Sequence, residues 1–336
     1  MRRILYALSA ITIVGAGFAV PMPVVEIAPG DAPPIAPLIE IQGQSITEVT
    51  GSLHLLTVNL KPPSLAEVVR ARLDDRRSLT RIENVIPEGV DRDVYFEEQR
   101  RVFELSFDVA AAMGARLAGF EVDVRTAPVV AEVIRGGPSQ GILEPGDVVV
   151  SIDGVQVDTG QQLADATGTF EMGATIPLTI ERAGQPMQVQ VQAGQTAQMN
   201  RPGLGVTVAG DTLLDVDLPF VVDLGPTRIG GPSAGMMIAL TVYDLLADED
   251  LADGRIIAGT GTIRLDGTIG SISGIPGKVA AAERIHADIM LVPGLLVDEA
   301  EAALTTDMRI IGVATIDDAL AALRDRSPRA PVPDEA

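Results

Sequence analysis

The chain contains no cysteine among its 336 residues, which excludes disulfide bonds, thiolate metal sites and cysteine nucleophiles. Histidine occurs only as His54 and His286, so a metal centre built from several histidines is not expected, and we expect no cofactor. Aromatic residues make up 3% of the chain, and 46 acidic residues against 25 basic ones give a formal net charge of −21. Nucleic acid is therefore not expected as a partner, because a phosphate backbone requires a clustered positive surface.

The N-terminus has almost no charge beyond two arginines. Residues 4–25 carry no charged side chain, and Pro21 and Pro23 end any helix there. About 17 apolar residues remain, roughly 25 Å of helix, which is just enough to cross a bilayer with the arginines at its interface. We expect residues 1–22 to anchor a single-pass protein in the cell membrane, with its catalytic domain extracytoplasmic. A signal peptide cleaved near Ala19 is the alternative, and it also exports the remainder.

The rest of the chain divides into four stretches. Residues 23–116 begin with a proline-rich linker and continue as a mixed region of strand and helix patterns. Residues 117–195 hold short strands separated by Gly- and Pro-rich turns, which is typical of a small β-rich domain. Residues 196–326 alternate strands and helices, which is typical of an α/β domain, and residues 327–336 are expected to be a disordered tail. The predicted fold class is multidomain, combining α+β and α/β architecture with an N-terminal transmembrane helix.

The β-rich stretch resembles a PDZ domain. The sequences VIRGGPSQG and GILEPGDVVVSIDGVQV match that family's pattern of turns and strands. In that family the backbone N–H groups of one loop bind a chain terminus, and the adjoining strand edge accepts an extended peptide. The resemblance implies that this peptide-binding loop consists of Leu117, Ala118, Gly119 and Phe120. A β-domain that only packs on its neighbour is the alternative.

A serine flanked by glycines precedes a strongly apolar helix pattern. In RIGGPSAGMMIAL, Ser233 lies between Gly231 and Gly235, which fits the G-x-S-x-G elbow of α/β-hydrolases. That family requires an acid and then a histidine downstream, for which the nominal candidates are Asp244, Asp248, Asp250 and His286. Because His286 falls near the end of a predicted helix rather than on a loop after a strand, the sequence disfavours this interpretation.

Lysine is the second candidate base, and the chain has only Lys61 and Lys278. A lysine acts as a base when burial or positive surroundings lower its pKa from about 10.4 toward neutrality. Lys278 follows Pro276, which suits the first turn of a helix, where the helix dipole disfavours a cation. Ile275 and Val279 supply apolar neighbours, and arginine could not replace lysine as a base. A solvated lysine after a Pro-Gly turn is the alternative.

Together, the two segments resemble the proteolytic domain of Lon proteases. The matching sequences are GGPSAGMMIAL, GTGTIRLDGTIGSISGIPGKVAAAERIHADIMLVP and DDALAAL. The resemblance implies that Ser233 is the nucleophile, Lys278 the general base and Thr260 a residue that supports this dyad. Gly230 and Thr262 depart from the Asp and Glu that many Lon enzymes have at these positions.

The resemblance implies a serine endopeptidase that cleaves unfolded or flexible extracytoplasmic protein segments, which are recruited through the PDZ-like domain. It also implies a homo-oligomer, with a hexamer as the form that the family resemblance suggests. ATP independence is expected because Ile272 and Val279 replace P-loop residues and no ATPase motif occurs. The expected oxyanion donors are backbone N–H groups at the start of the helix, from Pro232, Ser233 and Ala234. The alternative is a PDZ-based binding or scaffold protein at the membrane whose Lon-like domain has little or no activity.

Overall fold

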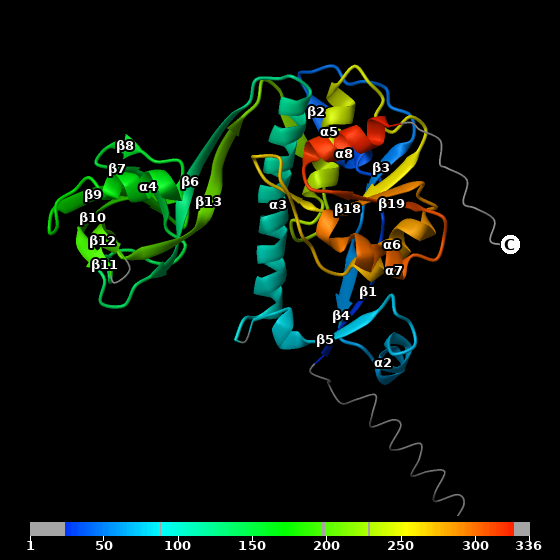
Figure 1. Cartoon of the computed structure of the whole chain (residues 1–336), viewed down its shortest axis with the longest axis horizontal. Coiled ribbons are helices and arrows are strands. Elements are labelled where there is room, and N and C mark those ends of the chain that lie inside the picture. The colour runs from blue at the N-terminus through cyan, green and yellow to red at the C-terminus, as the bar shows by residue number, and fades with distance from the viewer. Residues whose placement is uncertain (1–23, 88, 197–198, 228, 326–336) are drawn as a thin grey trace, which may run out of the picture. The chain divides into compact units, whose positions relative to one another are not determined.

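Figure 1 shows the protein as a computed structural model that describes residues 24–325 apart from residues 88, 197, 198 and 228. The described chain forms two compact units. One combines residues up to Glu121 with residues from Leu218 onward, and the other consists of Val122–Asp217.

A four-stranded parallel sheet organises the first unit, in the order β19-β18-β15-β3. The strands are β3 (Ser52–Leu55), β15 (Ile256–Gly259), β18 (Ile289–Pro293) and β19 (Arg309–Val313). Strands of this kind are buried on both faces and have continuous apolar sequences, as IMLVP in β18 illustrates. Because β3 comes from the N-terminal part of the chain, that region and the C-terminal α/β region form one structural unit.

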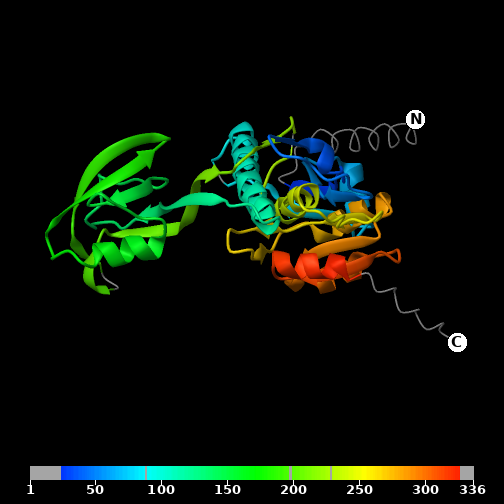
Figure 2. The same ribbon diagram turned by 90° about the horizontal axis from the view of Figure 1, so that it is seen from above.

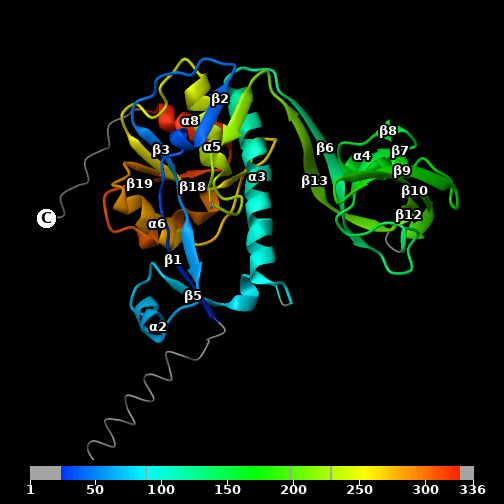
Figure 3. The same cartoon turned by 180° about the vertical axis from the view of Figure 1, so that it is seen from behind.

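Helices cover both faces of this sheet (Figure 3). The helices α5 (Gly235–Leu246) and α8 (Ile316–Arg324) pack on one face, and α6 (Ile275–Arg284) and α7 (Val297–Ala303) pack on the other. Successive residues of β15 face opposite sides of the sheet, which explains how helices can pack on both sides. A Cβ on Gly259 would meet Met237 of α5, whereas Ala258 belongs to the apolar cluster that contains α6 and α7 residues.

A long helix, α3 (Arg92–Leu117), lies along α5, as Figures 1 and 2 show. Its buried residues are spaced by three or four positions at Phe103, Ser106, Phe107 and Ala110, and residues 110–115 are all buried. The two helices approach closely at Gly114, where a Cβ would lie 2.6 Å from the Ala239 carbonyl oxygen and 2.6 Å from Val242 Cβ.

Short helices and antiparallel strand pairs complete the first unit. The short helix α2 spans Leu65–Ala71, and 3₁₀ turns occupy residues 36–38, 82–84 and 294–296. The paired strands are β4 (Val58–Lys61), β1 (Val24–Pro29) and β5 (Ser78–Arg81), then β2 (Ile39–Gln42) with β14 (Val221–Leu224), and β16 (Thr262–Ile263) with β17 (Ile269–Gly270).

The second unit is a β-sheet with one helix, α4 (Gly160–Thr167), packed on it. Its sheet has the order β10-β9-β7-β6-β13, with β8 beside β7, and a separate pair is formed by β11 and β12. The strands are β6 (Asp123–Val133), β7 (Val148–Ile152), β8 (Val155–Gln156), β9 (Thr175–Arg182), β10 (Gln185–Gln192), β11 (Gly194–Thr196), β12 (Met199–Gly203) and β13 (Val206–Asp217). Because β13 pairs with β6, this compact unit extends to Asp217.

The membrane anchor expected from the sequence requires correction. Within residues 24–325, as far as the structure describes them, no helix is long and apolar enough to cross a bilayer. The longest described helix, α3, has 26 residues but carries charged side chains along most of its length. The expected anchor at residues 1–22 and the tail at 327–336 lie outside the described residues. We therefore withdraw the transmembrane helix from the fold class, together with the single-pass membrane location and its extracytoplasmic catalytic domain.

Substituting Gly114→Ala should lower the free energy of unfolding by about 1–3 kcal/mol, because the added methyl group overpacks the contact between α3 and α5. This effect opposes the intrinsic preference of a helix interior for Ala over Gly, which is about 1 kcal/mol. Chemical denaturation measures the change. Glu98→Ala, on an exposed position of α3, is the control and should stay within about 0.5 kcal/mol. A Gly114→Ala protein as stable as the parent would contradict the close approach of the helices.

Candidate functional site

Three side chains that are distant in the sequence meet in the first unit. Lys278 Nζ lies 3.0 Å from Ser233 Oγ and 2.8 Å from Thr260 Oγ1. Lys278 and Thr260 are buried, whereas Ser233 is partly exposed. A buried amine thus contacts a hydroxyl that a substrate can reach.

Ser233 lies in the turn that leads into α5. Gly231 has φ +81°, a left-handed conformation that glycine adopts without strain. Its N–H donates a 2.8 Å hydrogen bond to the carbonyl of Gln99 on α3. At Gly230 a Cβ would lie 3.2 Å from Gln99 Cβ, so a side chain at position 230 would have little room. The contact with α3 therefore determines the path of the chain just before Ser233.

Lys278 lies near the N-terminal end of α6, after Pro276, as the sequence predicts. The helix follows Gly274, which has φ +77° and serves as its N-cap. The Lys278 side chain is 2% exposed, and Ile275 and Val279 beside it are fully buried. Burial lowers the pKa of Lys278 from 10.5 to about 7, because the charged amine loses its hydration. A substantial neutral fraction is therefore available near pH 7.

Thr260 follows the last residue of β15 and is fully buried. Its hydroxyl accepts the hydrogen bond from Lys278 Nζ and donates one of 3.0 Å to the Ser233 carbonyl. The N–H of Gly261 donates to the same carbonyl over 2.8 Å. Thr260 thus contacts both the amine and the backbone of the serine turn.

The predicted oxyanion donors do not all have an N–H group. Pro232 has none, so its inclusion was wrong on chemical grounds. Within the described part of the chain, the N–H groups of Ser233 and Ala234 donate no hydrogen bond. Both precede α5, whose N-terminal end carries a partial positive charge. These two groups are therefore available to an anionic oxygen.

The residues needed for a histidine-dependent elbow have other contacts. Asp244 is buried in α5, and its carboxylate accepts a 2.6 Å hydrogen bond from the Leu251 N–H. Asp250 accepts from the backbone N–H of Thr50. His286 has φ +55° and lines a different hollow, with Asp253 and Arg309 among its other lining residues. None of these groups contacts Ser233 among the described residues.

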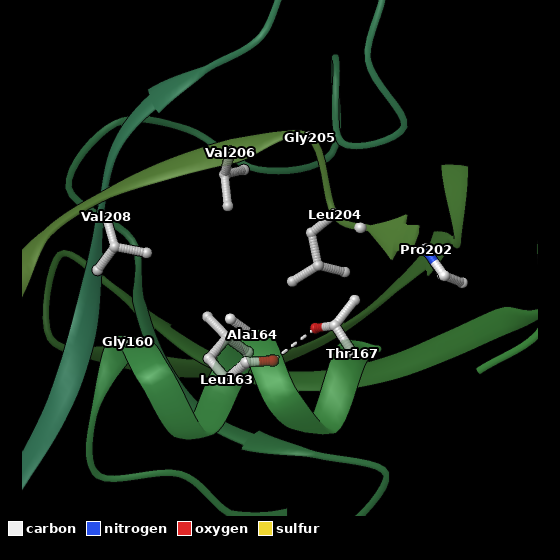
Figure 4. Close-up of a pocket in the computed structure, with 10 residues that line it drawn as sticks. Gly160, Leu163, Ala164, Thr167, Pro202, Leu204, Gly205, Val206 and Val208 are labelled. Atoms are coloured by element: carbon white, nitrogen blue, oxygen red, sulfur yellow. Dashed lines mark hydrogen bonds between the residues drawn. The ribbon is translucent and has the colours of Figure 1, made fainter. Parts of the chain in front are cut away.

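A second candidate site lies in the unit formed by residues 122–217. A hollow of about 100 Å³ separates α4 from the start of β13 (Figure 4). Most of its lining side chains are apolar, and the lining consists of Gly160, Leu163, Ala164, Thr167, Pro202, Gly203, Leu204, Gly205, Val206 and Val208. Because β13 is the last strand of its sheet, its outer edge is open to an added strand.

The loop before β13 presents backbone groups to this hollow. Ser139 Oγ donates a 2.6 Å hydrogen bond to the Leu204 carbonyl, and the Ile134 N–H donates a 2.8 Å bond to the Gly205 carbonyl. Both carbonyls are thus held by the rest of the unit. Since the N–H of a planar trans peptide points opposite to its carbonyl, the N–H groups that follow point away from these donors. The sequence Gly203-Leu204-Gly205-Val206, with closely spaced glycines directly before a strand, is the signal from which this loop could have been found.

The residues expected to form the peptide-binding loop, 117–120, lie at the C-terminal end of α3. Leu117 is the last residue of α3, Ala118 is its C-cap, and Gly119 has φ +90°. The ring of Phe120 packs edge-to-face on Phe220 with centroids 4.8 Å apart. All four residues belong to the first unit, whereas the hollow beside α4 belongs to the second. These residues therefore form a helix terminus and not part of that hollow.

Two family models match the chain. Residues 111–193 match the PDZ domain, and residues 184–324 match the Lon protease (S16) C-terminal proteolytic domain. Both resemblances noted in the sequence are thereby confirmed.

Individual proteins also match. The Lon protease of Campylobacter concisus is 34% identical over 116 residues, covering 33% of this chain and 14% of that protein. Lon protease 1 of Sorangium cellulosum is 32% identical over 160 residues, covering 45% and 19%. The periplasmic pH-dependent serine endoprotease DegQ of Escherichia coli is 29% identical over 120 residues, covering 33% and 25%. The chain thus spans a quarter or less of the length of these relatives.

From the lowered pKa of Lys278 we predict how the free energy of unfolding depends on pH, which can be tested without an activity assay. Above about pH 7 the folded chain has lost this proton, whereas the unfolded chain keeps it until about pH 10. The free energy of unfolding should therefore rise with pH in this window, by up to about 1.4 kcal/mol per pH unit relative to Lys278→Met. Denaturation between pH 7 and 9 measures the difference.

The other lysine provides the control. Lys61 is half-exposed and its pKa is raised by its hydrogen bond with Glu67, so it stays charged throughout this window. The stability difference between the parent and Lys61→Met should not change between pH 7 and 9. If the stability difference between the parent and Lys278→Met were also constant between pH 7 and 9, this result would contradict a lowered pKa of Lys278.

Proposed function

Because the chain combines a PDZ domain with a Lon-type proteolytic domain, we propose that it is a serine endopeptidase in which Ser233 and Lys278 form the catalytic dyad. The observation that carries this proposal is the buried amine of Lys278, which lies 3.0 Å from Ser233 Oγ and has a pKa near neutrality. A base with a pKa close to the working pH is effective in proton transfer. No histidine or carboxylate is needed to activate the serine.

The proposed reaction proceeds through an acyl-enzyme. Neutral Lys278 takes the proton from Ser233 Oγ as this oxygen attacks the carbonyl carbon of the scissile peptide bond. The N–H groups of Ser233 and Ala234 stabilise the resulting oxyanion. The ammonium group of Lys278 then gives its proton to the leaving amine, and the C–N bond breaks. Water, deprotonated by Lys278, hydrolyses the ester and regenerates the serine.

Thr260 is proposed to support both steps. Its hydroxyl gives the Lys278 amine a neutral partner at 2.8 Å, which favours a defined position without adding a charge. An acidic partner would raise the pKa of Lys278 and keep the amine protonated. A threonine in this place is therefore compatible with a lysine that must lose its proton.

Unfolded or flexible segments are the proposed substrates, and their hydrolysis by this chain is proposed to need no ATP. Attack on a peptide carbonyl requires an extended strand that can enter the site, and a folded domain does not offer one.

The hollow between α4 and β13 is proposed to bind such substrates by a terminal carboxylate and an apolar last side chain. The second candidate function is binding alone, with the hollow occupied and the dyad inactive.

Turnover of an unstructured protein such as casein, without nucleotide, tests the dyad. Ser233→Ala and Lys278→Met should each reduce kcat about a thousandfold or more, because nucleophile and base act as a unit. Activity of the parent should rise with pH through about 7 as Lys278 loses its proton. Lys61→Met is the matched control and should retain full activity. Cleavage by both dyad variants at the parental rate would refute the assignment.

Binding of a fluorescent peptide to the Ser233→Ala protein tests the hollow separately. A peptide with an apolar C-terminal residue and a free carboxylate should bind at least about tenfold more tightly than its C-terminal amide, which lacks the charge. Val208→Arg should abolish binding by filling the hollow, whereas Val155→Arg, at a position 65% exposed on β8, should not. Equal binding of acid and amide would rule out carboxylate recognition. Binding without turnover by the parent would favour the second function.

A further inference from the structure

The orientation of the proposed oxyanion donors depends on two peptide units around Ser233. In the second of these, the Ser233 carbonyl accepts hydrogen bonds from Thr260 Oγ1 and from the Gly261 N–H. Because a trans peptide unit is planar, holding the carbonyl also fixes the N–H of Ala234, which points in the opposite direction. One donor is therefore oriented by residues at the end of β15.

The first peptide unit is held from another element. The Pro232 carbonyl accepts a 3.3 Å hydrogen bond from Ser106 Oγ on α3 and a 3.3 Å bond from the Gly235 N–H. By the same geometry these bonds fix the direction of the Ser233 N–H. The Gly235 bond belongs to the turn itself, so Ser106 is the side chain that ties this unit to the surrounding structure.

Ser106 is well placed to be rigid. It is 9% exposed, in the buried stripe of α3 that faces α5. A Cβ on Gly235 would lie 3.0 Å from Ser106 Oγ, so the glycine permits the hydroxyl to approach the turn. The neighbouring bond from Gly231 to the Gln99 carbonyl ties the same turn to α3 one position earlier.

We propose that Ser106 is a positioning residue, whose hydroxyl holds the Pro232–Ser233 peptide unit so that the Ser233 N–H faces the oxyanion. Its catalytic consequence rests on the proposed peptidase function. Ser106 touches neither the substrate nor Lys278, and it lies 127 residues before the nucleophile in the sequence. The oxyanion hole is then completed by a helix outside residues 184–324, the stretch that matches the Lon proteolytic domain.

The test is Ser106→Ala in the full chain, assayed for kcat and KM with an unstructured peptide substrate. We expect kcat to fall about tenfold, which is less than the hundredfold or more expected when an oxyanion donor is removed outright. KM should stay within about twofold, because the donor acts on the transition state. The pH at which activity rises should not move, since the burial of Lys278 is unchanged.

Thr241→Val is the matched control. Thr241 also carries a buried hydroxyl, but it donates to the Met237 carbonyl within α5 and not to the Pro232 carbonyl. It should leave kcat unchanged. Ser106→Ala with a parental kcat would overturn the proposal, and so would a shift of the pH profile, because the hydroxyl would then act through Lys278.

A crystal structure of Ser106→Ala provides a readout that does not depend on turnover. A rotated or disordered Pro232–Ser233 peptide would support the positioning role even if the parent proves to have no peptidase activity, in which case only the proposed function fails. An unchanged peptide orientation would overturn the positioning role whatever the activity.

Discussion

The hydrogen bond between Lys278 Nζ and Ser233 Oγ is made by a lysine whose side chain lies in an apolar interior. Burial of an ammonium group is unfavourable, so the site favours the neutral amine, which is the form that can accept a proton. Thr260 satisfies the amine without adding a charge. Since burial is the cause of the lowered pKa, every element that excludes water from Lys278 belongs to the site, including apolar positions that make no contact with Ser233.

The parallel sheet explains how three residues separated in sequence come together. Thr260 follows β15, while α5 and α6 pack on opposite faces of the sheet and bring Ser233 and Lys278 toward the end of that strand. In open parallel sheets, sites form at the carboxyl ends of the strands, where loops from neighbouring units converge. The N-terminal part of the chain contributes β3 to the sheet and α3 to the turn before Ser233. Residues 24–116, which the sequence shows only as a mixed region of strand and helix patterns, are therefore part of the same structural unit.

The sequence predicts local features well and non-local contacts poorly. Ser233 and Lys278 could be found because each lies in a short motif with a chemical requirement, and the structure brings them together. The role of α3 was not visible, because its helical pattern does not tell which helix it packs on. The position of Leu117–Phe120 at the end of α3 was not visible for a related reason, since a glycine that ends a helix resembles a glycine in a binding loop. The pairing of β13 with β6, which lies far earlier in the chain, is a further non-local contact that the sequence pattern did not indicate.

Both candidate sites use the same arrangement of backbone groups. At Ser233 and again at Gly205, surrounding donors hold the carbonyl ends of consecutive peptide units and direct the N–H ends the opposite way. Each site is proposed to bind an anionic oxygen, an oxyanion at Ser233 and a carboxylate at Gly205. A cationic side chain could stabilise the same oxygen, and near Lys278 it would lower the pKa further by repulsion, but it would add a second charge that must be desolvated. Oriented N–H dipoles carry no net charge and need no such desolvation. They therefore suit an apolar site in which the proposed base must be neutral.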